Sequence, residues 1–193
     1  MVKQKFQITN WCHGFIQDHV REGDICVDAT VGNGNDTELL CSLVGVTGKV
    51  YGFDIQRQAL NSTEERLKEK GYQAHLLCVG HEMMHQYIQE FGEVSCIVFN
   101  LGYLPGGDHS KCTKAITSIS AIESSLRLLR AGGVISLCIY SGGDSGFEEK
   151  EAVLDFLKCL DNKRYLVIVS EYYNRPNNPP IPVLIYKIGE SGR

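Results

Sequence analysis

A short polar segment between an apolar run and a helical stretch carries the residues best suited to bind a ligand. Asp28 ends the apolar run, and Gly32 and Gly34 follow it closely. Glycine has no Cβ, so this turn lets the backbone approach a bound molecule and adopt dihedral angles closed to other residues. Ligands of open α/β sheets bind beyond the carboxyl ends of the strands, where the turn would lie. The candidate binding residues of the turn are Asp28, Thr30, Gly32, Asn33, Gly34, Asn35, Asp36 and Thr37.

Two later strand ends supply further polar groups that an adenosine could contact. Asp54 ends the next apolar run, 20 residues after Gly34. A carboxylate at this position can accept hydrogen bonds from both ribose hydroxyls. His81 follows the third run and could lie beside the adenine. Each residue also has a structural interpretation, with Asp28 organising the turn, Asp54 capping a strand and His81 capping a helix.

The turn fits S-adenosylmethionine better than NAD. The dinucleotide motif G-x-G-x-x-G requires a third glycine, and Thr37 stands at that position. Asp36 would place a negative charge near the helix start, which opposes a bound phosphate. A ligand with a positively charged amino or sulfonium group suits this site, and S-adenosyl-L-methionine has both.

Apolar runs alternate with helical segments along the chain, which is typical of a mostly parallel sheet. We therefore expect an α/β fold: a Rossmann-like class I methyltransferase with a seven-stranded sheet and helices on both faces. The last two strands are joined by a proline-rich piece without a crossover helix, so the last strand should be antiparallel and lie beside the fifth. The expected strands are 25–28, 49–54, 74–78, 96–100, 134–140, 166–172 and 183–187, and the expected helices are 9–20, 35–43, 57–70, 82–91, one ending at 131–133, and one that contains Val153, Leu157 and Leu160.

Length and composition indicate one soluble domain. The 193 residues suffice for one core, and 43% hydrophobic with 22% charged residues is the balance of a globular protein. The sequence shows neither an apolar run of roughly 20 residues nor a secretory signal, so we expect a cytoplasmic protein without membrane contact. The eight cysteines include no Cys-x-x-Cys pair, which favours reduced thiols and no metal site.

The segment after the fourth apolar run could hold the group that receives a methyl. Asn100 ends this run, and its side-chain carbonyl can accept the hydrogens of an amine and direct the nitrogen lone pair. The segment from Asn100 to Tyr103 is similar to the Asn-Pro-Pro-Tyr motif of amino-group methyltransferases, and Tyr103 could stack on a base. Asp108 and His109 could take up a proton. Alternatively, Asn100 caps the strand and Asp108 belongs to an ordinary turn.

Several blocks together resemble the family first labelled putative rRNA methylase, whose better-understood members are bacterial tRNA 5-aminomethyl-2-thiouridine methyltransferases. The resemblance covers almost the whole chain and implies methyl transfer from S-adenosylmethionine to the amine of a 5-aminomethyl group on the wobble uridine of a tRNA anticodon loop. Gln56 and Asn100 join the cofactor-binding residues, and Asn100, Tyr103 and Asp108 are the catalytic candidates. The blocks are 28–37, Gly52-Phe-Asp-Ile-Gln56, Gly80-His81, 100–108 and 174–180.

One block departs from the family, and the substrate stays open on the residues alone. The family usually has Tyr-x-Gly-His after the fifth strand, whereas this chain has Gly143 in place of the histidine. A net charge of −4 argues against wrapping of long nucleic acids and would suit a small-molecule amine, although it allows binding to one RNA loop. Another RNA, such as rRNA, and a homodimer are further possibilities, and an NAD enzyme or nucleotide-binding regulator is the remaining alternative. Candidate phosphate contacts are Lys111, Lys114, Arg164 and Arg175.

Overall fold

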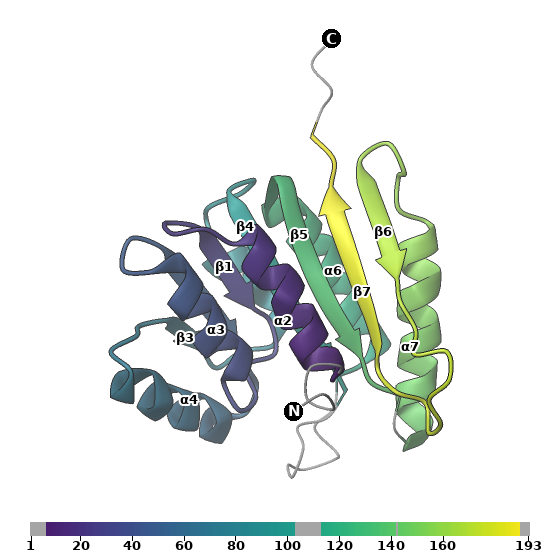
Figure 1. Ribbon diagram of the computed structural model, residues 1–193, viewed down its shortest axis with the longest axis horizontal. Helices are drawn as coiled ribbons and strands as arrows, with labels where there is room; N and C mark the ends of the chain where they lie inside the picture. Colours follow the sequence, from purple (N-terminus) through teal and green to yellow (C-terminus); the bar gives the residue numbers. More distant parts are fainter. Residues whose placement is uncertain (1–6, 103–112, 142, 190–193) are drawn as a thin grey trace.

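The computed structural model describes residues 7–102, 113–141 and 143–189. Within these residues, seven strands form one sheet in the order β3-β2-β1-β4-β5-β7-β6 (Figure 1). The strands are β1 (Ile25–Asp28), β2 (Lys49–Phe53), β3 (His75–Leu77), β4 (Val94–Leu101), β5 (Leu129–Ile139), β6 (Tyr165–Val169) and β7 (Ile181–Lys187). The helices are α2 (Ile8–His19), α3 (Asn35–Val44), α4 (Arg57–Glu69), α5 (Met84–Tyr87), α6 (Ala115–Leu128) and α7 (Gly143–Lys158), with a 3₁₀ turn η1 (His81–Met83) before α5.

The strand directions confirm the predicted Rossmann-like architecture. Strands β1 to β5 pair in parallel, and β7 is antiparallel to both β5 and β6. The predicted position of the last strand beside the fifth is therefore confirmed. Strands β1, β2 and β4 are parallel, so their carboxyl ends lie side by side. Asp28, Phe53 and Asn100 are located at these carboxyl ends.

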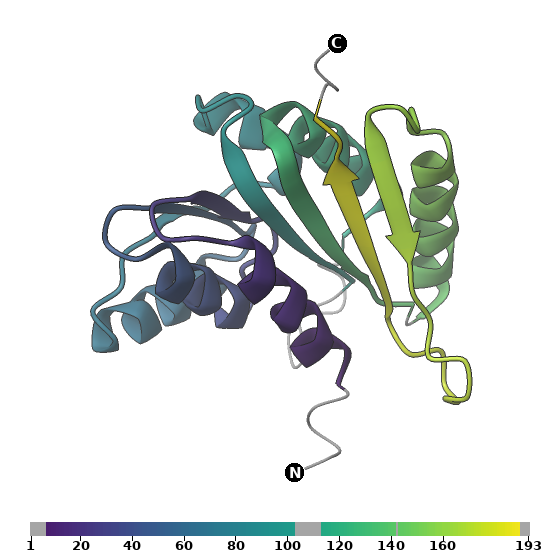
Figure 2. The ribbon, with the colours of Figure 1, turned by 45° about the horizontal axis from the view of Figure 1, so that its top comes forward.

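Helices cover both faces of the sheet, and each face has its own apolar core. Figures 1 and 2 show α2 and α3 on one face, and α6 and α7 on the other. Successive residues of β4 point to opposite faces: Val98 packs with α2 and α3, whereas Ile97 and Phe99 pack with α5, α6 and α7. The long buried strand β4 thus fixes Asn100 at its carboxyl end.

The predicted helix over 82–91 is wrong in its length. Helix α5 ends at Tyr87, and Ile88 is extended, with φ −101° and ψ 119°. The Glu90 carboxylate accepts hydrogen bonds from Lys49 Nζ at 2.7 Å and from the Tyr51 hydroxyl at 3.1 Å. These contacts with β2 fix a non-helical turn, and tertiary contacts override the local helical pattern.

The boundary between α6 and β5 also differs from the prediction. The sequence favoured a helix ending at 131–133 and a strand starting at Val134, but α6 ends at Leu128 and β5 begins at Leu129. Val94 pairs with Leu129 and Cys96 pairs with Val134, so residues 130–133 bulge from the strand. Gly132 has φ +74°, which a bulge of this kind favours. At the end of the chain, β6 stops three residues earlier and β7 begins two residues earlier than predicted.

Most of the described cysteines are buried. Cys26, Cys96 and Cys138 are buried within strands as predicted, whereas Cys78 is half-buried just after β3. The described cysteines are all free thiols. Among the described residues, no helix is both long enough and apolar enough to cross a membrane.

Candidate functional site

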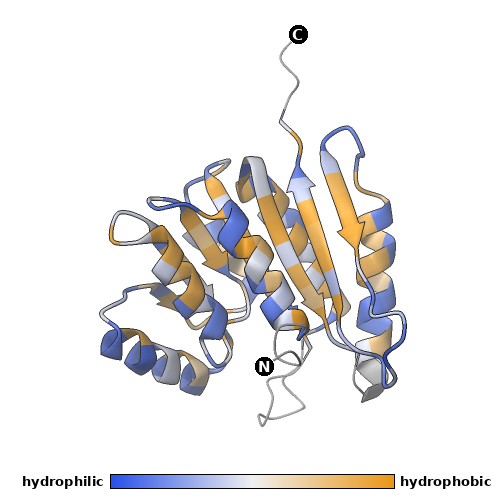
Figure 3. Cartoon of the chain, in the orientation of Figure 1, coloured by the Kyte–Doolittle hydropathy of each residue, from blue (hydrophilic) through white to orange (hydrophobic). Residues whose placement is uncertain are grey.

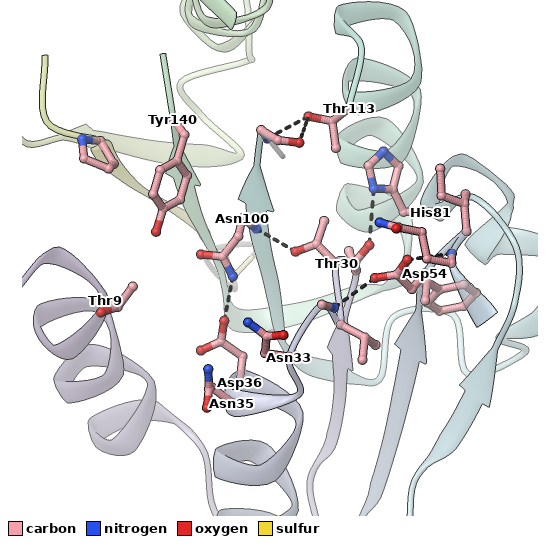
Figure 4. A pocket seen from close by; sticks show the side chains of 18 of the residues that line it. Thr9, Thr30, Asn33, Asn35, Asp36, Asp54, His81, Asn100, Thr113 and Tyr140 are labelled. Carbon is pink, nitrogen blue, oxygen red and sulfur yellow. Dashed lines mark hydrogen bonds between the residues drawn. The ribbon is translucent and has the colours of Figure 1, made fainter. Parts of the chain in front are cut away.

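A pocket of about 1300 Å³ opens at the carboxyl ends of the parallel strands. Its walls come from the loops after β1, β2 and β3, from the ends of β4 and β5, and from helix α2 (Figure 4). The predicted site residues that line it are Thr30, Gly32, Asn33, Asn35, Asp36, Asp54, Gln56, His81 and Asn100.

Three residues of the segment 28–37, the glycine-rich turn, lie behind the pocket wall and shape it. The buried Asp28 carboxylate accepts the Thr30 amide at 3.1 Å and the Thr37 hydroxyl at 2.6 Å. Burial raises the pKa of Asp28 to about 7. Gly34 has φ +74°, and a Cβ there would lie 2.5 Å from Thr63 Oγ1. Asp28, Gly34 and Thr37 therefore hold the turn, and their side-chain positions lie outside the pocket lining.

The Asp54 carboxylate is oriented by two backbone amides. Its Oδ2 accepts the Gly32 amide at 2.9 Å, and its Oδ1 accepts the Gln56 amide at 2.8 Å. A carboxylate has about four acceptor positions, so each oxygen keeps a lone pair for a ligand. The side chain lies in the pocket wall (Figure 4). This geometry suits a ligand with two neighbouring hydroxyl groups.

An apolar slot next to Asp54 is closed by a neutral histidine. His81 is buried, and its Nδ1 lies 3.2 Å from the Ala29 carbonyl oxygen, which can only accept, so Nδ1 carries a proton. Burial lowers the pKa of His81, which keeps the ring uncharged. Its ring packs edge-on against Phe99, and Phe53 and Val31 also line the pocket here. The slot suits a flat aromatic ligand group.

A hydrogen-bonded chain joins helix α2, the glycine-rich turn and the end of β4. Asp36 accepts His13 Nε2 at 2.5 Å on one carboxylate oxygen and Asn100 Nδ2 at 2.6 Å on the other. The Asn100 backbone amide donates to Thr30 Oγ1 at 2.7 Å (Figure 4). Because the amide nitrogen of Asn100 is held by Asp36, the side-chain carbonyl oxygen is left for a ligand. The Asp36 carboxylate raises the pKa of His13.

A second chain of side chains fixes the backbone just after β4. Thr113 Oγ1 accepts the Gly102 amide at 2.8 Å and donates to Glu149 Oε2 at 2.8 Å. The buried Glu149 also accepts the Ser118 hydroxyl at 2.6 Å. The Thr113 amide donates to the Gly102 carbonyl oxygen at 3.1 Å. Helices α6 and α7 thereby hold Gly102 and Thr113 together at the pocket wall.

Some predicted residues lie elsewhere or outside the described residues. Tyr103, Asp108, His109 and Lys111 fall within 103–112, which the structure does not describe. Gly143, where the family usually has histidine, is the first residue of α7. Of the candidate phosphate contacts, Lys114 lines the pocket, whereas Arg164 packs on the Tyr165 ring and Arg175 is exposed.

Sequence reasoning missed four residues that the fold brings to the site. His13, Thr113 and Tyr140 line the pocket, and Glu149 lies behind Thr113. Burial raises the pKa of Tyr140, so its hydroxyl stays protonated. One signal was available for His13: it follows Asn10 by three positions, which places both polar side chains on one face of a helix. Thr113 and Glu149 lie 36 residues apart and gave no local signal.

Comparisons with known proteins agree on one family. A family described as "Putative rRNA methylase" matches residues 50–186. A tRNA (mnm(5)s(2)U34)-methyltransferase, chloroplastic, from Arabidopsis thaliana is 35% identical over 93% of this chain and 69% of its own length.

Two solved structures are similar over nearly their whole length. A putative rRNA methylase from Clostridium thermocellum has a TM-score of 0.92 and 47% identity over 94% of this chain and 98% of its own. A putative methyltransferase from Streptococcus mutans in complex with SAH has a TM-score of 0.85 and 37% identity over 93% of this chain and 97% of its own. With its sheet order and pocket, this chain belongs to the putative rRNA methylase family of methyltransferases.

Proposed function

We propose that this protein transfers a methyl group from S-adenosylmethionine to the amine of 5-aminomethyl-(2-thio)uridine at the wobble position of tRNA. The name of the Arabidopsis relative supports the substrate, and SAH in the Streptococcus mutans structure supports the cofactor. The observation that carries the proposal is the fixed amide of Asn100, whose nitrogen is held by Asp36 at 2.6 Å. This leaves a carbonyl oxygen in the pocket that can accept the hydrogens of an amine.

The loops after β1, β2 and β3 would hold the cofactor. Asp54 would accept hydrogen bonds from the ribose hydroxyls, and Gln56 lies beside it. The slot closed by His81 would take the adenine. The methionine part would lie along the turn that Asp28, Gly34 and Thr37 hold from behind. Its direct contacts would come from Thr30, Gly32, Asn33, Asn35, Asp36 and Asn100.

Positioning would supply most of the acceleration. When bound, S-adenosylmethionine supplies a methyl group on a positively charged sulfur, which passes to the amine in one in-line displacement. The protein must hold the neutral amine in line with that methyl group, and holding reactants in this way can remove much of a barrier. Asn100 Oδ1 would accept an amine hydrogen and so direct the lone pair. We further propose that Tyr103 stacks on the uracil ring and that Asp108 takes up the proton that the product amine releases.

The proposed partner is the anticodon loop of tRNA in the cytoplasm. Lys114 lines the pocket, where it could contact a phosphate beside the target nucleotide. A protein of 193 residues with a net charge of −4 offers a small surface without a general positive field. We infer that two copies form a homodimer, because this would enlarge the surface available to a folded RNA.

The test is transfer of labelled methyl from S-adenosylmethionine to tRNA that lacks its final wobble methylation, followed by nucleoside mass spectrometry. We expect a methylaminomethyl-thiouridine peak that disappears when the tRNA is digested with RNase before the reaction. Asn100→Ala and Asp54→Ala proteins should lose the peak. Binding of SAH without label transfer would overturn the tRNA assignment, and rRNA and small amines would then be tested as acceptors.

A further inference from the structure

Helix α2 brings a histidine to the pocket beside Asn100. Figure 3 shows α2 lying across the sheet, with both hydrophobic and hydrophilic residues along its length. Cys12 and Ile16 are buried in the cores, whereas Asn10 and His13 line the pocket. Residues three positions apart lie on one face of a helix. The pattern of α2 therefore directs the His13 side chain to the ligand site.

His13 is linked to Asn100 through one carboxylate. Asp36 Oδ1 lies 2.5 Å from His13 Nε2, and Asp36 Oδ2 accepts Asn100 Nδ2 at 2.6 Å (Figure 4). The His13 side chain is 25% and the Asp36 side chain 14% exposed, so water and salt screen this pair less than a surface pair. Among the described residues, His13 is the only basic side chain within ion-pair distance of Asp36. The charge on His13 therefore balances this carboxylate.

The Asp36 carboxylate alone would oppose the proposed reaction. An amine that donates to Asn100 Oδ1 would lie less than about 8 Å from Asp36, because only the amide group and one hydrogen bond on each side separate them. A negative charge at that distance favours the ammonium form of the amine, whose nitrogen has no lone pair for the attack. A positive charge on the other side of the carboxylate has the opposite effect.

We propose that His13 is a positioning residue for methyl transfer: paired with Asp36, its imidazolium offsets the carboxylate charge, so that the substrate amine is held in its neutral form. This inference rests on the proposed function and deepens it. The ammonium proton leaves to water before the attack. The amine lone pair then forms the bond to the methyl carbon, while the bond from this carbon to sulfur breaks and leaves its electron pair on sulfur. His13 acts through Asp36 and takes no part in these bond changes.

Other titratable groups surround this pair. Burial, together with the charge of Asp36, raises the pKa of the buried Asp28 to about 7. Glu38 on α3 is already paired with Arg66 and Lys70. The remaining groups near the pair, within the described part of the chain, are Cys12 on α2, Cys96 on β4, Cys138 and Tyr140 on β5, and Lys114 in the pocket wall. These groups and the bound cofactor are the same in every variant at position 13, so a comparison of variants isolates the charge of that side chain.

The test is the pH dependence of single-turnover methyl transfer to tRNA that lacks its final wobble methylation, with protein and cofactor saturating. The rate should rise between pH 6 and pH 9 as the amine loses its proton. His13→Gln keeps a hydrogen-bond donor without the charge, so its rate should be about fivefold below that of the natural protein at pH 6.5 and nearly equal to it at pH 9. His13→Lys keeps a positive charge and should follow the natural profile.

His19→Gln is the matched control, since it makes the same change on α2. The His19 ring bonds the Phe15 carbonyl and is absent from the pocket lining, so the profile should stay unchanged. Circular dichroism and titration with SAH would verify that each variant is folded. A His13→Gln rate lowered by the same factor at every pH, or a His13→Lys profile like that of His13→Gln, would overturn this inference alone. Absence of transfer by the natural protein at every pH would overturn the proposed function with it.

Discussion

The two halves of the pocket, which the proposed function assigns to the cofactor and to the methyl acceptor, are built in different ways. In the cofactor half, carboxylates bind backbone amides that are near in sequence, as Asp28 binds Thr30 and Asp54 binds Gln56. In the acceptor half, side chains bind partners far along the chain: Asn100 binds Asp36, 64 residues away, and Thr113 binds Glu149. Part of the first half is thus fixed by local chain geometry, although Asp54 also accepts the Gly32 amide 22 residues away, whereas the second half depends mainly on contacts between distant segments.

This difference predicts that substitutions in the two halves will affect different quantities, the affinity for the cofactor and the rate of methyl transfer. A change in the cofactor half should act on affinity for S-adenosylmethionine, because its groups hold a ligand that is present throughout the reaction. A change in the acceptor half should act on the rate, since its groups orient an amine at the moment of attack.

The largest effect is expected for Asn100→Ala. Loss of the carbonyl oxygen that directs the amine should lower kcat by roughly 10²–10³-fold, the usual effect of removing one oriented polar group from an active site. Affinity for SAH should fall less, because Asn100 is only one of six residues that we expect to contact the methionine part of the cofactor. Steady-state kinetics on tRNA and calorimetric titration with SAH would measure the two quantities. Thr117→Ala, in the same pocket wall, is the matched control; an equal loss of kcat and SAH affinity would contradict the assignment of Asn100 to the acceptor half.

In the cofactor half, Asp54→Ala should weaken SAH binding by about 100-fold. The change removes an ionised acceptor for two ribose hydroxyls, and hydrogen bonds to charged groups contribute about 1.5–3 kcal/mol each. Asp54→Asn keeps one acceptor oxygen and should have a smaller effect. Asp161→Ala removes an exposed carboxylate far from the pocket and should leave the titration unchanged. An Asp54→Ala protein that binds SAH normally but transfers the methyl group slowly would contradict the assignment of Asp54 to the cofactor half.

The same contrast explains what the sequence could predict. The turn from Asp28 to Thr37 was readable because its function depends on glycines and carboxylates at fixed local spacing. The mostly parallel sheet followed from the alternation of apolar runs, and the antiparallel last strand beside the fifth followed from the short final connection. The contact between Thr113 and Glu149 depends on how α6 and α7 pack, and no local pattern encodes that packing.

The errors in the fold have the same origin. The sequence around Glu90 has a helical pattern, but the contacts of Glu90 with Lys49 and Tyr51 end the helix early. Leu129 was assigned to a helix, yet it is fully buried beside Val94 and begins a strand. In both segments a contact with a distant strand outweighed the local preference.

A smaller effect, on stability, is expected for Thr113, whose hydroxyl links Gly102 to Glu149 behind the acceptor half. Thr113→Val should lower the free energy of unfolding by about 1–3 kcal/mol, because it leaves the buried Glu149 carboxylate and the Gly102 amide without one partner each. Urea denaturation would measure the change. Thr113→Ser keeps the hydroxyl and should stay close to the natural protein. If Thr113→Ser destabilises the protein and Thr113→Val does not, packing of the methyl group and not the hydrogen bond is what matters at this position.

The smallest effect concerns the pH dependence of the link between His13 and Asp36. The carboxylate raises the pKa of His13, so the stability that this pair contributes is fully present below the ordinary histidine pKa of about 6.5. It is lost as pH rises through the higher pKa of the folded state. The difference in unfolding free energy between the natural protein and His13→Gln should therefore reach about 1 kcal/mol at pH 6 and shrink toward pH 9.

Taking this difference isolates His13 from two other groups that respond to pH. Asp28, with a pKa raised to about 7, makes the fold less stable as pH rises from about 4 to 7, and His81, with a lowered pKa, makes it less stable below about 6.5. Both are present in both proteins, so their contributions largely cancel. His75→Gln, which changes an exposed side chain of β3, is the matched control. A difference for His13→Gln that is the same at pH 6 and pH 9 would show that His13 holds Asp36 by packing alone, and helix α2 would then stabilise the acceptor half without any charge on His13.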